Sequence, residues 1–95
     1  MVEVKWSPQA VEDFKGILEY IGKDSSLYAA SFAEKILVAV ESLSSNAERG
    51  RIVPEKKDPM IREIFLKKYR IIYRITADIV EIVTIIHGSR SNFKI

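Results

Sequence analysis

The sequence predicts an α+β fold in which an N-terminal antiparallel helical hairpin packs on one face of a small, mainly antiparallel β-sheet. Two observations lead to this class. Apolar residues recur at helical spacing between residues 8 and 46, whereas strand-like alternation and short turns dominate after residue 50. We expect a single domain over residues 1–95, because a chain of this length buries about two-thirds of the surface that it exposes when unfolded.

The first elements are a short strand and a helix. Residues 2–6 alternate, so we expect Val2, Val4 and Trp6 to face the core. Ser7 followed by Pro8 is typical of a helix start, because serine caps the first N–H groups and proline has none to lose. The apolar residues of this helix are Val11, Phe14, Ile17, Leu18 and Ile21. Its acidic residues, Glu12, Asp13 and Glu19, are predicted to form an ordinary solvated face.

A second, longer helix should begin near residues 24–26 and fade near residues 44–46. Its predicted core stripe is Ala29, Phe32, Ala33, Ile36, Leu37, Val40 and Leu43. The connection between Gly22 and Ser25 is short, which favours two antiparallel neighbouring helices.

Strands dominate the second half of the chain. After Gly50, a loop punctuated by Pro54 and Pro59 contains a brief strand at residues 51–53. Further strands are predicted at residues 61–67, 69–76 and 79–87. The compact turn at residues 76–78 makes the last two strands an antiparallel hairpin. The last strand is apolar on both faces, which is typical of an interior strand.

Composition limits the classes of function. The chain has no cysteine and one histidine, so we expect no disulfide, no metal site and no cofactor. No apolar run approaches the roughly 20 residues of a membrane span, and the N-terminus lacks the pattern of a signal peptide. We therefore expect a cytoplasmic protein without a membrane partner.

Charge is strongly segregated along the chain. Residues 1–48 carry 4 Lys/Arg and 8 Asp/Glu, a net charge of −4, whereas residues 49–74 carry 9 and 3, a net charge of +6. Residues 75–95 are balanced. Such asymmetry favours nucleic acid or an acidic partner, although an exposed loop around Lys56 and Lys57 explains part of it.

Alternation along residues 69–75 of the predicted strand places aromatic and basic side chains on opposite faces. Tyr69 and Tyr73 share one face and are predicted core aromatics, while Arg70 and Arg74 share the other. If the helices cover the tyrosine face, both arginines should emerge on an open one. We expect Arg62 to join them from the neighbouring strand.

His87 and Arg90 follow the last strand and should lie at the end of the sheet. Together with the strand arginines they predict a shallow basic cradle for an anion. Phe93 is placed to stack on a base.

Several short motifs, taken in order, resemble those of RelE/ParE-type toxins. They are Trp6-Ser-Pro-Gln-Ala10, Tyr20-Ile21, Gly50-Arg51, Val53-Pro54-Glu55, Arg62-Glu63, Tyr69-Arg-Ile-Ile-Tyr-Arg74 and His87-Gly-x-Arg90. The resemblance spans nearly the whole chain and implies the same helical hairpin on a small sheet. It also implies the toxin half of a type II toxin–antitoxin module, of the kind associated with plasmid stabilization, which a cognate antitoxin neutralises.

The resemblance implies one of two targets. RelE-like members cleave mRNA on the ribosome, and ParE-like members inhibit DNA gyrase without being nucleases. Arg70 falls on the strand arginine that holds the scissile phosphate in the RelE pattern, and Arg90 lies close to its C-terminal arginine. The expected lysine pair is absent, with Ile61 and Glu63 near those positions. A late tyrosine is also missing, Phe93 being the nearest aromatic.

These residues define a candidate site, for which alternative roles are also considered. The candidate catalytic set is Arg70, Arg90, His87 and Glu63, with Glu63 or His87 as acid or base. The candidate target-binding set is Arg51, Arg62, Lys67, Lys68, Arg74 and Phe93. For Glu63 the alternative is an ion pair with a neighbouring arginine. A degenerate toxin and a non-toxic nucleic-acid-binding module are the alternatives for the whole chain.

The expected antitoxin should wrap an extended or helical segment over a sheet edge or over the helical hairpin. Exposed apolar residues would anchor it, with Leu27, Tyr28 and Phe65 as candidates. The same surface would allow a homodimer in place of the toxin–antitoxin hetero-oligomer.

Overall fold

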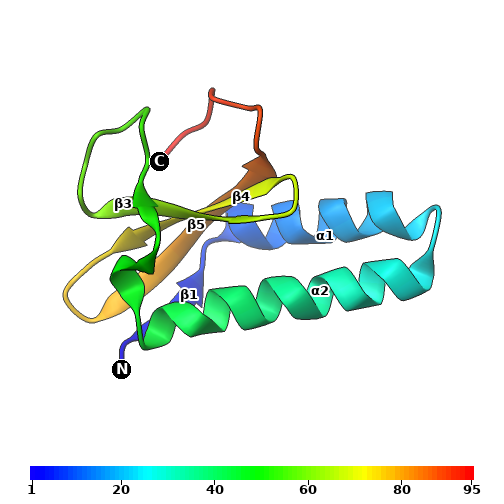
Figure 1. The fold of residues 1–95 in the computed structure, drawn as a ribbon, viewed down its shortest axis with the longest axis horizontal. Coiled ribbons are helices and arrows are strands. Elements are labelled where there is room, and N and C mark those ends of the chain that lie inside the picture. Colours follow the sequence, from blue (N-terminus) through cyan, green and yellow to red (C-terminus); the bar gives the residue numbers. More distant parts are fainter.

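The computed structural model describes residues 1–95 and shows two helices on one side of a five-stranded sheet (Figure 1). The elements are β1 Glu3–Trp6, α1 Pro8–Gly22, α2 Ser26–Glu41, β2 Arg51–Ile52, β3 Ile61–Leu66, β4 Tyr69–Ile75 and β5 Ile79–His87. Two short 3-10 turns, Ser42–Ser44 and Ala47–Arg49, separate α2 from β2. The predicted α+β class is confirmed.

Strand pairing is antiparallel except at one edge. The strand order is β1-β5-β4-β3-β2, and β1 runs parallel to β5. The tight turn after Ile75 is closed by a hydrogen bond from the Thr76 N–H to the Ile79 carbonyl. The last two strands therefore form the predicted hairpin.

Both helices begin where the sequence predicts. The Ser7 hydroxyl accepts a hydrogen bond from the Ala10 N–H at 3.0 Å, and the Ser25 hydroxyl accepts one from the Tyr28 N–H at 3.0 Å. Each serine thus satisfies an amide that has no partner within its helix. Neither helix has the length and apolar character needed to cross a membrane.

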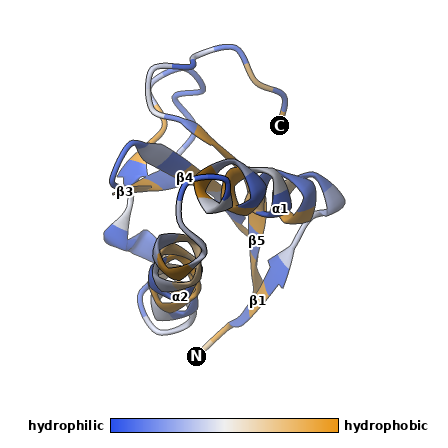
Figure 2. Cartoon of the chain, turned by 90° about the vertical axis from the view of Figure 1, so that its right-hand side faces the viewer, coloured by the Kyte–Doolittle hydropathy of each residue, from blue (hydrophilic) through white to orange (hydrophobic).

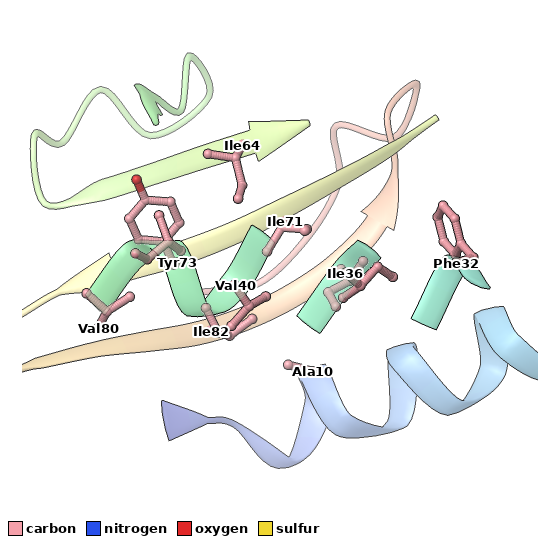
Figure 3. Packing of buried hydrophobic residues seen from close by; sticks show 11 residues of the cluster. Ala10, Phe32, Ile36, Val40, Ile64, Ile71, Tyr73, Val80 and Ile82 are labelled. Atoms are coloured by element: carbon pink, nitrogen blue, oxygen red, sulfur yellow. The ribbon is translucent and has the colours of Figure 1, made fainter. Parts of the chain in front are cut away.

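The main core lies between the helices and the sheet (Figure 3). Phe32, Ile36 and Val40 of α2 pack with residues of β4 and β5 such as Ile71 and Ile82. Hydrophobic residues are concentrated along β5 and on parts of both helices, whereas the loops are largely hydrophilic (Figure 2). The predicted core stripe of α2 is mostly confirmed. The prediction that Leu37 belongs to it is wrong, because Leu37 is 49% exposed on the outer side of the helix.

The other face of the sheet is also covered, contrary to the open face that we expected. A smaller cluster there contains Val53, Ile61, Ile72 and Ile86, with Phe93 and Ile95 packed against it. The loop of residues 53–60 and the C-terminal tail lie on the side of the sheet away from the helices (Figure 1). The face that carries Arg70 is therefore covered by chain segments instead of being a bare cradle.

Asp13 is a second correction. Because β1 pairs only with Ile79–Ile82, the rest of the outer edge of β5 lacks a strand partner. The Asp13 carboxylate accepts hydrogen bonds there from the Ile85 N–H at 3.0 Å and the Thr84 hydroxyl at 2.5 Å. Asp13 is thus half-buried and structural, and is not part of a solvated face.

Candidate functional site

The register of the sheet decides which of the predicted residues share a face. Arg51 of β2 lies opposite Glu63 of β3, and Phe65 of β3 lies opposite Arg70 of β4. Directly paired residues project to the same side of a sheet. These four side chains therefore share the face away from the helices, where Arg70 was predicted to lie.

Arg70 is on the predicted face but is only 3% exposed. Its Nε donates to Glu63 Oε1 at 2.5 Å. Its two terminal nitrogens donate to the two oxygens of Glu55 at 2.8 and 2.9 Å. One of them also donates to the Arg90 carbonyl at 2.7 Å. The guanidinium is therefore bound within the protein by two carboxylates and one carbonyl.

Glu63 completes a row of alternating charges. It is 1% exposed, and its second oxygen accepts a hydrogen bond from Arg51 Nε at 2.6 Å. Arg51, Glu63, Arg70 and Glu55 consequently form an ion-pair row, each charge beside one of opposite sign. The row carries no net charge, so it attracts an external anion far less than two free arginines would. The ion-pair alternative for Glu63 is the arrangement observed.

The row changes the titration of its members. Hydrogen bonds from Arg70 lower the pKa of the Glu55 carboxyl from 4.5 to about 2, against the opposing effect of burial. The hydrogen bonds from Glu55 in turn raise the pKa of Arg70. Both groups therefore stay charged at neutral pH, and neither can give or take a proton there.

Phe93 also takes part in this arrangement instead of being presented for base stacking. The Arg70 Cζ lies 5.3 Å from the centre of the Phe93 ring, and Lys56 Nζ lies 5.4 Å from it. Arg51 similarly lies over the Phe65 ring at 5.1 Å. The two cation–π contacts to Phe93 hold the C-terminal tail over the ion-pair row.

Arg62 and Arg74 do not extend a basic surface. Arg62 lies opposite Tyr73 and so projects to the helical side, which corrects the expectation that it joins Arg70. Its guanidinium donates to the carbonyls of Gly50 and Pro59, each at 3.0 Å. Arg74 is half-buried and pairs with Glu81 at 3.1 Å.

The predicted catalytic residues fall into two places. His87 projects to the helical side with Tyr69, their rings 6.1 Å apart, and its Nδ1 lies 2.8 Å from the Ser89 hydroxyl. The Arg90 guanidinium donates only to the Asn92 carbonyl, at 3.1 Å. His87 and Arg90 line one groove of about 370 Å³ beside α1. Arg70 and Glu63 lie elsewhere, in the ion-pair row.

Lys67 and Lys68 form the turn between β3 and β4 and are exposed. They border a second groove, of about 440 Å³, that is lined by aromatic residues. This groove shares Tyr20, Tyr69 and His87 with the groove beside α1.

Sequence reasoning missed Glu55, the bidentate partner of Arg70. A loop glutamate by itself gives no sign that its side chain reaches back over a strand. The only signal in the sequence was its place in the Val53-Pro54-Glu55 motif. No group of three His, Cys, Asp or Glu side chains is arranged to hold a metal ion.

Comparisons with known proteins agree on one family. The family model of the ParE toxin of the type II toxin–antitoxin system parDE matches residues 4–92. Toxin RelE2 of Caulobacter vibrioides is 34% identical over 91 residues, which cover 95% of this chain and 99% of that toxin.

A solved structure of the chromosomal ParDE toxin–antitoxin system from P. aeruginosa shares the fold. Its TM-score is 0.76, at 22% identity, over 92% of this chain and 96% of that one. Together with the fold described above, the family match shows that the chain belongs to the ParE toxins of the RelE/ParE superfamily and is the toxin of a type II toxin–antitoxin system.

Proposed function

We propose that this toxin arrests growth in the cytoplasm by inhibiting DNA gyrase and that it does not cleave RNA. The single observation that carries the choice is the internal saturation of Arg70 by Glu55, Glu63 and the Arg90 carbonyl. The RelE-like alternative needs this arginine on the scissile phosphate. The ParE-like alternative requires no phosphate-binding arginine.

The energetic cost of freeing Arg70 favours the same choice. Moving Arg70 onto a phosphate would leave Glu63 buried with only Arg51 to balance it. Breaking a buried ion pair typically costs about 3–5 kcal/mol. The binding energy of an RNA substrate would have to offset this cost before Arg70 could accelerate cleavage. The lysine pair and the late tyrosine of the RelE pattern are absent as well, and Phe93 has no hydroxyl to move a proton.

Gyrase supercoiling is the direct test. Relaxed plasmid, ATP and purified gyrase are titrated with the purified toxin, and the relaxation of the supercoiled form of the same plasmid by topoisomerase I serves as the control. We expect supercoiling to be lost at toxin concentrations near that of gyrase while topoisomerase I stays active. Intact supercoiling at saturating toxin would exclude the gyrase proposal, and equal loss of both activities would indicate nonspecific binding to DNA.

Ribosome-dependent mRNA cleavage is the second candidate. The groove shared by His87 and Arg90 favours it, because an imidazole and a guanidinium lie there without an acidic ion-pair partner. These two groups could supply a proton and stabilise phosphate charge. Toxin-dependent cuts that disappear in His87→Gln would support this candidate over gyrase inhibition.

We also propose that a cognate antitoxin covers the exposed apolar side of α2. Leu27 and Val38 are exposed there, and a groove of about 560 Å³ lies between α2 and the Leu66 end of β3. An amphipathic segment fits such a surface. Val38→Glu should then leave the toxin active and weaken its neutralisation, as read by growth during co-expression with the antitoxin.

A further inference from the structure

The turn between β3 and β4 holds a lysine in an unfavourable backbone conformation. Leu66 pairs with Tyr69, so only Lys67 and Lys68 form the turn. Lys67 has φ of +54°, a region that glycine and asparagine adopt far more readily. The Lys67 side chain makes no hydrogen bond or ion pair that would offset this strain, since every such contact in the chain involves other residues. Backbone strain that no hydrogen bond or ion pair offsets is typical of residues with a functional role.

An aromatic groove begins beside this turn. Tyr69 and the buried Phe32 form its floor, with ring centres 5.6 Å apart. Tyr20 and Tyr28 line its outer part and are 71% and 50% exposed. Large aromatic side chains exposed around a hollow are typical of sites that receive an anchoring side chain.

The rim of the aromatic groove carries two positive charges. Lys67 and Lys68 supply them, and no acidic residue lines the groove. Neither lysine belongs to an ion pair, in contrast to the arginines of the neighbouring strands. An occupant should therefore combine an apolar part with negative charge.

We propose that the aromatic groove is the surface through which the toxin holds its target, and that its occupant is an acidic protein segment with one large apolar or aromatic side chain. The apolar side chain would enter between Tyr20 and Tyr28, with carboxylates beside Lys67 and Lys68. This inference rests on the proposed inhibition of a protein target. A single-stranded nucleic acid fits less well, because it needs a track of successive stacking platforms and cations, whereas here both lysines lie at one end of a short hollow.

The chain offers a matched pair of variants. Lys57 has the same φ of +54° but lies in the loop of residues 53–60, outside the aromatic groove. Lys67→Gly and Lys57→Gly each remove one positive charge and relieve the same backbone strain, so each should raise Tm by a few degrees or leave it unchanged. Only Lys67→Gly should raise the toxin concentration for half-inhibition of gyrase, by about tenfold, as expected for one lost charge-assisted contact.

Equal potency of Lys67→Gly and Lys57→Gly would overturn the inference and leave gyrase inhibition standing. Absence of inhibition by the wild-type toxin would instead count against the proposed function. A second readout needs no gyrase, namely the NMR shifts of the Lys67 and Lys68 amides on addition of the peptide Glu-Glu-Phe-Glu-Glu or of a ten-nucleotide oligo(dT). We expect the peptide to move these amides and the oligonucleotide to leave them unchanged. The opposite result would replace the protein segment by nucleic acid.

Discussion

Arg70 and Glu63 are charged residues at the centre of a sheet, and their contacts define the ion-pair row. Alternation along the strand was enough to place Arg70 on the face away from the helices. It could not reveal that Glu55 and the Arg90 carbonyl meet the guanidinium there, because both belong to segments without regular periodicity. A side chain's face can be read from local sequence, whereas its partners depend on how distant segments fold back.

We expect Arg70→Ala to destabilise the protein by about 3 kcal/mol, because it leaves Glu63 buried with one ion-pair partner. Arg74→Ala is the matched control, since Arg74 lies on the same strand and face in a half-exposed pair with Glu81. The control should cost less than about 1 kcal/mol. Urea denaturation measures both. Similar small losses for the two variants would show that the ion-pair row contributes little.

Glu55 makes stability depend on pH in the acid range. Its pKa is about 2 in the folded protein and near 4.5 when it is free of Arg70. The unfolded chain therefore binds more protons between these values, so the contribution is complete above about pH 5 and is lost as the pH falls toward 2. Glu55→Gln should flatten this part of the profile. The measurement is the free energy of unfolding between about pH 6 and pH 3, and identical slopes would argue against the assigned contact.

At the scale of elements, periodicity and caps predicted nearly everything that forms a helix or strand. Ser7 marked the first helix start and residues 24–26 the second, and the strands from Ile61 onward lie close to their predicted bounds. The parallel pairing of β1 with β5 was not predicted, since pairing between ends of the chain has no local signal. The role of Asp13 was missed for the same reason, because it depends on where β1 stops.

Asp13→Ala should destabilise the fold by about 2 kcal/mol, because the Ile85 N–H and the Thr84 hydroxyl lose their acceptor at a partly buried edge. Glu12→Ala, one position earlier on the same helix, removes only an exposed pair with Lys15 at 3.8 Å. It should change stability by no more than about 0.5 kcal/mol. Thermal unfolding of the two variants separates these outcomes, and equal Tm values would return Asp13 to the solvated face first predicted.

For the whole molecule, charge segregation predicted an anionic partner on an open sheet face, but that face is covered by the chain itself. Most of the arginines between residues 49 and 74 are taken up internally, Arg51 and Arg70 by carboxylates and Arg62 by carbonyls. The lysines of the β3–β4 turn remain free beside the aromatic groove. The recognition surface that we propose therefore lies at the end of the sheet instead of on the covered sheet face.

We propose that this toxin acts without cutting RNA, because its strand arginine is held by its own carboxylates. Primer extension of mRNA on translating ribosomes, with and without the purified wild-type toxin, is the decisive experiment. We predict identical mRNA ends in both reactions. New ends that appear only with toxin and increase with its concentration would contradict the claim.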